Sequence, residues 1–243
     1  MKSNWFSNFS QKLGKTKLFC FPYAGGNAST FARWHESLPQ HLAVLGLQMP
    51  GRASRLMEAP IDNMEQLTTM IADQMSFHIN GDYVMFGHSL GARVAFEVAV
   101  KLMERGVPSP NYFLASGSPA PSLKRTEAPI YDLPETEFIE ELRKKGGTPE
   151  LILQNEELKS IFLPALRADF KMVDHYRQSD RKLKVRAHVF YGVEDNTIST
   201  ESAMGWKYHF TESCAFHAVN GDHFFIDNNR EDVLSLIRQI LVG

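Results

Sequence analysis

The sequence lacks the features that mark membrane, nucleic-acid-binding and secreted proteins. Its 243 residues carry 26 Lys and Arg against 28 Asp and Glu, a formal net charge of −2, with both signs interspersed. Without a basic stripe, a nucleic acid is not expected as the main ligand. No apolar run approaches the roughly 20 residues of a membrane-spanning helix, and the first residues lack the continuous apolar centre of a signal peptide. We therefore expect a cytoplasmic protein with no membrane or nucleic-acid partner.

Cysteine is also scarce, and the usual metal motifs are missing. Cys20 and Cys214 each lie inside an apolar stretch, which favours reduced thiols in the core over a disulfide or a metal site. The nine histidines form no HExxH pattern and there is no CxxC pair. Neither the GxGxxG spacing nor a P-loop lysine is present. We expect neither a metal ion nor a cofactor.

What the sequence does contain is an alternation of short apolar bursts with longer stretches of helical periodicity. Bursts of strand length occur at 18–21, 43–47, 83–86, 112–115, 187–191 and 215–219. Helical periodicity is clearest at 64–79, 90–104 and 230–241. Near-continuous apolar strands that alternate with helices indicate a parallel sheet covered on both faces. The pattern predicts one α/β domain over residues 1–243.

Residues 125–180 break this alternation, because they contain no strand signal. EFIEELRKK places Phe138, Ile139 and Leu142 on one helix face, and LPALRADFKMVDHY continues with helical spacing. More than fifty helical residues are too many for a simple connection between strands. We interpret 125–180 as an inserted helical lid, in which Pro164 should kink or split a helix over 156–176.

A serine between glycines, Gly87-His88-Ser89-Leu90-Gly91, follows one of the strand bursts and begins a helical stretch. The pattern G-x-S-x-G is weak by itself, but in this setting it is typical of a nucleophilic serine on a strained turn. A side chain at 87 or 91 would collide across so sharp a turn. The alternative is a glycine-rich corner with an inert serine.

A serine hydroxyl needs a base, and the base needs an orienting acid. His223 lies just after the last strand burst, at the carboxyl end of the predicted sheet where ligands bind. Asp195 follows the fifth burst at the same end, and the chain order Ser89, Asp195, His223 is that of α/β-hydrolases.

Other side chains compete for these two roles. Glu194 is the nearest alternative acid, and two further aspartates, Asp222 and Asp227, flank the histidine too closely to reach its ring. His188 and His217 lie inside strand bursts, and His88 is expected to point away from the serine.

A tetrahedral intermediate also needs two backbone N–H donors. One should belong to Leu90, directly after the serine. The loop FPYAGGNAS after the first burst offers a second at Ala24, because Gly25 and Gly26 permit an unusual backbone path. An ordinary turn at the two glycines is the alternative.

Several stretches together resemble the type II thioesterases that accompany nonribosomal peptide and polyketide synthases. They are FPYAGGNAS, MPGR at 49–52, FGHSLGARVAFE, SGSPAP at 116–121, LPALRADF and GDHFF. The resemblance implies an α/β-hydrolase fold, Ser89 as nucleophile, His223 as base, Asp195 as its orienting acid, and backbone donors at Leu90 and about Ala24. One departure is PGRASR, where the family often has an acidic residue after PGR, so the partner of Arg52 is open.

The resemblance also implies the substrate, an acyl thioester on the phosphopantetheine arm of a carrier protein. Because carrier proteins are commonly acidic, Arg143, Lys144 and Lys145 are candidates for contacting them, although a solvated helix end is the simpler interpretation. We expect a monomer. The alternatives are a carboxylesterase or lipase of the same fold, or a non-catalytic protein that binds a small ligand.

Overall fold

The computed structural model describes residues 4–10, 14–177 and 179–242 of the chain. Its strands are β1 (Phe6–Asn8), β2 (Thr16–Phe21), β3 (Leu42–Leu47), β4 (Tyr83–His88), β5 (Tyr112–Ser116), β6 (Arg186–Gly192) and β7 (Cys214–Val219). Its α-helices are α1 (Trp34–Ser37), α2 (Met64–His78), α3 (Leu90–Glu104), α4 (Glu135–Lys145), α5 (Glu150–Gln154), α6 (Glu156–Asp174), α7 (Thr200–Met204), α8 (Phe225–Asn228) and α9 (Arg230–Val242). Three short 3₁₀ turns are η1 (Ala28–Phe31), η2 (Ala53–Arg55) and η3 (Gly205–His209).

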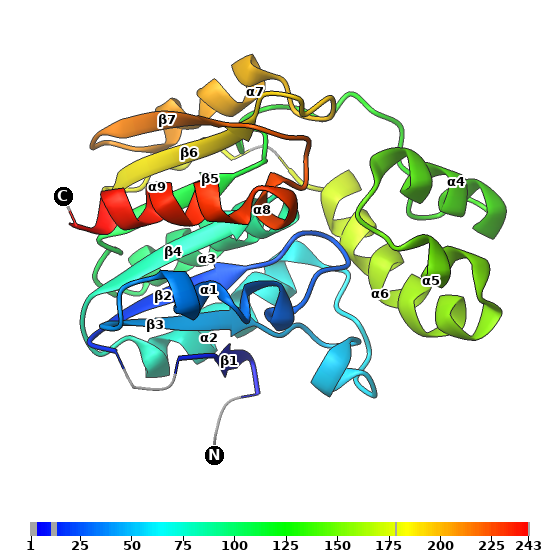
Figure 1. Cartoon of the computed structure of the whole chain (residues 1–243), viewed down its shortest axis with the longest axis horizontal. Coiled ribbons are helices and arrows are strands. Elements are labelled where there is room, and N and C mark those ends of the chain that lie inside the picture. Colours follow the sequence, from blue (N-terminus) through cyan, green and yellow to red (C-terminus); the bar gives the residue numbers. More distant parts are fainter. Residues whose placement is uncertain (1–3, 11–13, 178, 243) are drawn as a thin grey trace.

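In the described residues the strands form one sheet in the order β1-β3-β2-β4-β5-β6-β7 (Figure 1). Every pairing from β3 through β7 is parallel, and only β1 runs antiparallel, with Phe6 opposite Leu47. All six predicted strands and the predicted α/β architecture are confirmed. β1 was not predicted, because three residues give too short a pattern to recognise.

Both faces of the sheet are buried, which explains the continuous apolar bursts. In β2, Phe19 and Phe21 join a cluster with α2 and α3, whereas Leu18 and Cys20 join a second cluster with α1 and α9. Successive strand side chains point to opposite faces, so each face needs its own apolar set. Both cysteines have free thiols; Cys20 is buried and Cys214 is half-buried.

Three helices, α4, α5 and α6, lie between β5 and β6 in the chain and form a separate group beside the sheet (Figure 1). They have a core of their own, built from Ile130, Phe138, Ile139, Leu142, Leu153, Leu163 and Leu166. The structure thus places an all-helical insertion within the range 125–180 in its described part, and we call α4–α6 the inserted helices.

Pro164 was expected to kink or split the helix; the split is wrong, because α6 continues through the proline from Glu156 to Asp174, and the kink stays a prediction. A proline inside a helix costs about 3 kcal/mol. Leu163 and Leu166, on either side of it, are buried in the core of the inserted helices. Burial of such side chains contributes about 1.5–3 kcal/mol each, which is enough to hold the helix together.

The fold brings the predicted site residues to one end of the sheet. β4 ends at His88 and leads directly into Ser89, β6 ends at Gly192 shortly before Asp195, and β7 is followed by the loop that carries His223. Parallel strands place their carboxyl ends along a common edge. Among the described residues, no helix has the length and apolarity needed to cross a membrane.

Candidate active site

Ser89 lies on the turn between β4 and α3 in a strained backbone conformation. Its φ of 54° and ψ of −120° are rarely adopted by a residue with a side chain. A Cβ on Gly87 would lie 2.4 Å from the carbonyl oxygen of Gly91, and one on Gly91 would lie 2.1 Å from that of Phe21. Both glycines are therefore sterically required, as predicted, for the serine to project from this turn.

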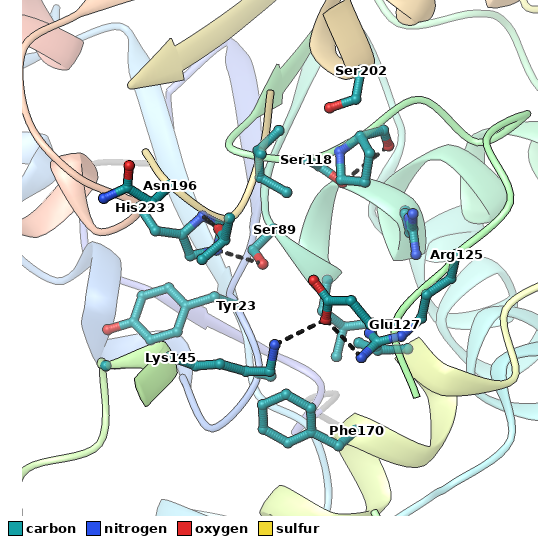
Figure 2. Close-up of a pocket in the computed structure, with 18 of the residues that line it drawn as sticks. Tyr23, Ser89, Ser118, Arg125, Glu127, Lys145, Phe170, Asn196, Ser202 and His223 are labelled. Atoms are coloured by element: carbon teal, nitrogen blue, oxygen red, sulfur yellow. Dashed lines mark hydrogen bonds and ion pairs between the residues drawn. The ribbon is translucent and has the colours of Figure 1, made fainter. Parts of the chain in front are cut away.

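His223 joins Ser89 and Asp195 in a continuous hydrogen-bonded relay. The Nε2 atom of His223 lies 2.9 Å from Oγ of Ser89, and its Nδ1 atom lies 2.7 Å from Oδ2 of Asp195. Figure 2 shows the imidazole beside the serine at the edge of a cavity. The three residues selected from the sequence are thus in direct contact. His223 is 134 positions from Ser89 and 28 positions from Asp195 in the chain.

Asp195 is well satisfied as an anion. Besides His223, its Oδ1 accepts hydrogen bonds from the amide and hydroxyl of Thr197 and from the amide of Ile198. Burial raises the pKa of this carboxyl, but the hydrogen bond and charge of His223, together with the two hydrogen bonds from Thr197, outweigh burial, so the pKa lies below its ordinary value. Asp195 is thus ionised at neutral pH and can stabilise a charged imidazole.

Two of the competing acids have other partners. Asp222 accepts a hydrogen bond from the amide of Phe224, and Asp227 accepts one from the hydroxyl of Tyr23. Among the histidines, His188 and His217 stack on each other and share a 2.9 Å contact away from the serine. None of these side chains is placed to replace Asp195 or His223.

His88 supports the site in a way that the sequence did not reveal. Its ring is fully buried; Nε2 lies 2.8 Å from the carbonyl oxygen of His223, and Nδ1 lies 2.9 Å from the hydroxyl of Ser116. Since a carbonyl only accepts, Nε2 carries the hydrogen and donates it. Burial, with a smaller effect of the charge of His223, lowers the pKa of His88 to about 3. A neutral His88 therefore anchors the backbone of the His223 loop.

Two backbone amides are available near Ser89. Leu90 is the first residue of α3, where N–H groups have no partner within the helix, and the amide of Ala24 has no hydrogen-bond partner among the described residues. Both residues line the cavity that contains Ser89. The next amide along, that of Gly25, donates instead to Asp169 at 2.8 Å.

Asp169 links the inserted helices to the loop that contains Gly25, and it is the acidic partner of Arg52. It is fully buried on α6, and its carboxylate forms a bidentate pair with Arg52 at 2.6 and 2.8 Å while it accepts the Gly25 amide. Arg52 also donates to the carbonyl of Gly26. The acidic partner thus comes from LPALRADF, 117 residues away, rather than from the residue after PGR.

A cavity of about 490 Å³ lies between the end of the sheet and the inserted helices. Ser89, Leu90 and His223 line one side, and Leu142, Leu166 and Phe170 of the inserted helices line the other. Figure 2 shows Glu127 at this cavity bridging Lys145 and Arg125, with both contacts at 3.0 Å. Phe170 thus faces the cavity, whereas Phe138 packs inside the helical core.

Comparison with known proteins decides the family. Residues 16–241 match the model of the thioesterase domain family. The chain belongs to the thioesterase family. It is 33% identical over 237 residues to the gramicidin S biosynthesis protein GrsT of Aneurinibacillus migulanus, a match that covers 97% of this chain and 93% of GrsT.

Solved structures agree with this thioesterase in fold. RedJ, a thioesterase from the prodiginine biosynthetic pathway of Streptomyces coelicolor, superimposes with a TM-score of 0.87 at 35% identity, over 93% of this chain and 90% of RedJ. YbtT, a type II thioesterase from the yersiniabactin NRPS/PKS pathway, gives 0.86 at 27% identity, over 97% of both chains. The predicted α/β-hydrolase fold, family resemblance and thioester hydrolase activity are confirmed.

Proposed function

We propose that this thioesterase is a type II enzyme that hydrolyses acyl groups from the phosphopantetheine arm of carrier proteins in a nonribosomal peptide or polyketide synthase. The names of its relatives support this role, since GrsT belongs to gramicidin S biosynthesis and YbtT is a type II thioesterase of an NRPS/PKS pathway. The observation that carries the proposal is the Ser89–His223–Asp195 relay at the edge of a cavity large enough for a small acyl group.

In the first half of the reaction Ser89 is the nucleophile. His223 Nε2, 2.9 Å away, accepts the hydroxyl proton as Oγ bonds to the thioester carbonyl carbon. The carbonyl oxygen becomes negative and is stabilised by the amides of Leu90 and Ala24. The carbon–sulfur bond then breaks, the proton on His223 passes to the sulfur, and the carrier regains its free thiol while the acyl group stays on Ser89.

In the second half the same groups act on water. His223 accepts a proton from a water molecule whose oxygen adds to the acyl carbon, and the bond to Ser89 Oγ then breaks as the proton returns to the serine. The products are a free acid and the original enzyme. Asp195 holds the imidazole in the tautomer with hydrogen on Nδ1 and stabilises its cationic form through the 2.7 Å hydrogen bond.

The inserted helices act in this proposal as a lid that shapes the acyl site. Their side chains line the cavity opposite Ser89, and Asp169 ties α6 to the Gly25 amide beside the proposed oxyanion donor at Ala24. The basic residues at the end of α4 already pair with carboxylates, Arg143 with Glu150 and Lys144 with Glu141. Those pairs are exposed, and exposed pairs are weak enough to exchange with an acidic partner.

The test is a deacylation assay on a carrier protein loaded with an acetyl thioester. Loss of the acetyl group is followed by the mass of the intact carrier, for the wild type, for Ser89→Ala and for Ser76→Ala. Ser76 is an exposed serine on α2 and serves as the matched control. We expect the wild type and Ser76→Ala to deacylate the carrier and Ser89→Ala to match the blank without enzyme; equal rates for wild type and Ser89→Ala would refute the proposal.

The same assay separates the two alternatives. A carboxylesterase or lipase would give a higher kcat/KM with free esters than with carrier-bound thioesters. A non-catalytic binding protein would hydrolyse neither substrate and would gain no mass at Ser89 from a sulfonyl fluoride.

A further inference from the structure

Arg93 is a buried cation for which the proposed mechanism has no use. It follows Ser89 by four residues on α3, lines the same cavity and is only 6% exposed. Among the described residues its guanidinium forms no hydrogen bond and no ion pair, and its Nε is buried without a hydrogen-bond partner. Its guanidinium carbon lies over the ring of Tyr176, 4.7 Å from the ring centroid.

The other arginines buried near the site are all compensated. Arg52 has the carboxylate of Asp169, and Arg55 pairs with Glu58 and donates to the carbonyl of Gln48. A buried charge without a hydrogen-bonded counterpart is costly. A guanidinium stays protonated even when burial lowers its pKa, because this side chain is not deprotonated in proteins. Among the residues that the structure describes, none supplies such a counterpart for Arg93, so its charge is available to a ligand.

The charges that line the cavity indicate the sign of this partner. The cationic lining residues are Arg93, Lys124, Arg125 and Lys145, and the only carboxylate among the described lining residues is Glu127. Glu127 is already shared between Arg125 and Lys145. Arg125 has a second carboxylate in Asp174, at 3.2 Å. Arg93 has none, and the nearby charge of Arg125 adds to burial in lowering its pKa.

We propose that Arg93 is a specificity-determining residue that binds a carboxylate at the far end of the acyl chain, so that the preferred substrates are monothioesters of dicarboxylic acids. The inference rests on the proposed function, because it takes the acyl group to be attached at Ser89. A planar guanidinium can hold a carboxylate through two parallel N–H donors. Burial strengthens this pair because little water competes for either group.

The position of Arg93 also limits where the carboxylate can lie. Four residues along an α-helix correspond to about 6 Å of rise. The backbone of Arg93 therefore lies about one helical turn from Ser89, the residue that bears the acyl group. The carboxylate must therefore stand several bonds beyond the thioester carbonyl. A two-carbon acetyl group cannot reach it, whereas a chain of intermediate length can.

The test compares acyl chains that differ only in this terminal group. Carrier proteins are loaded with succinyl, glutaryl or adipoyl groups. Each of these acyl chains is paired with a methyl ketone of the same length, in which a methyl group replaces the charged oxygen of the terminal carboxylate. An acetyl group serves as the short reference. The spontaneous rate without enzyme is subtracted, because dicarboxylic thioesters can react internally. The readout is kcat/KM for each member of a pair, in the wild type, Arg93→Met, Arg93→Lys and Arg186→Met.

We expect the wild type to favour the carboxylate over the ketone at least tenfold for one chain length, mostly through KM. Arg93→Met should reduce that ratio at least tenfold, and Arg93→Lys should restore part of it. Arg186 is the matched control: it is exposed and stacks on Tyr112 at 4.4 Å, outside the cavity lining. Arg186→Met should keep the wild-type ratio.

Three results would overturn the inference. In one, the wild type shows no carboxylate preference at any length although it deacylates the acetyl carrier, which leaves the proposed function standing. In the second, Arg93→Met lowers kcat/KM equally for carboxylate, ketone and acetyl chains. Arg93 would then bind the pantetheine arm, which all the substrates share, or stabilise the fold. In the third, no carrier thioester is cleaved at all, which removes the proposed function and the inference together.

Discussion

Two arginines near the catalytic end of this thioesterase are equally buried but differently paired. Arg52 is 6% exposed and its guanidinium is held by Asp169 and by the carbonyl of Gly26. Arg93 is also 6% exposed, yet in the described part of the chain its guanidinium has no hydrogen-bonded or ionic partner and lies over the ring of Tyr176. The comparison separates two uses of a buried charge. Arg52 is part of the framework that joins the inserted helices to the Gly25 loop, and Arg93 is left open toward the cavity.

The largest effect should come from breaking the paired arginine. Arg52→Met leaves the fully buried carboxylate of Asp169 without its cation, and we expect the free energy of unfolding to fall by about 3–5 kcal/mol. Urea denaturation followed by fluorescence measures the loss. Removing both charges in Arg52→Met/Asp169→Leu should recover most of it. A single variant that unfolds at the wild-type urea concentration would show that the pair contributes nothing.

His88 adds a third case to the two arginines, because it is a titratable group that is buried in its neutral form. The unfolded ring takes up a proton as pH falls below about 6.5, whereas the folded ring stays neutral down to about 3. Its contribution to stability is therefore complete above pH 6.5 and is lost as pH falls from there toward 3. Each pH unit in this window should cost up to about 1.4 kcal/mol.

The measurement is urea denaturation of the wild type and His88→Gln at pH 7, 6, 5 and 4. The stability of the wild type should fall more steeply with acid than that of the variant, because the other histidines are common to both proteins and cancel in the difference. Parallel pH curves would contradict the neutral, buried state of His88.

The smallest effect should come from the unpaired arginine. Arg93→Met removes a buried charge for which the described residues supply no counter-ion, and it keeps a side chain of similar length. We therefore expect the free energy of unfolding to stay the same or to rise by about 1 kcal/mol. The same denaturation experiment checks this. If Arg93→Met lowered the free energy of unfolding as much as Arg52→Met does, Arg93 would be needed for the stability of the fold, and the two arginines would have the same role.

The sequence was sufficient for the parts of the site that local pattern and chain order determine. Ser89 could be found because a strained turn demands glycines at fixed offsets, and Asp195 and His223 because parallel strands bring their following loops to one edge. Asp169 and His88 could not be found in this way. Their partners are 117 and 135 residues away, and nothing in the spacing indicates which buried polar groups will meet.

The fold, too, could be predicted where local pattern determines it and not where long-range packing does. Six strands were predicted because each is apolar on both faces, whereas the three-residue β1 gives no such signal. Pro164 does not split α6, because the tertiary packing of Leu163 and Leu166 outweighs the local helix penalty of a proline. The boundaries of the lid at 125 and 180 stay predictions.

The most direct measurement is the rate at which phenylmethanesulfonyl fluoride modifies the enzyme, with the modified peptide identified by mass. Activation of Ser89 by His223 predicts a single adduct on the peptide that contains Ser89, and a rate on the order of 10²-fold lower in His223→Ala, the contribution typical of a general base. An adduct on another residue, or an unchanged rate in His223→Ala, would contradict a serine activated by this histidine.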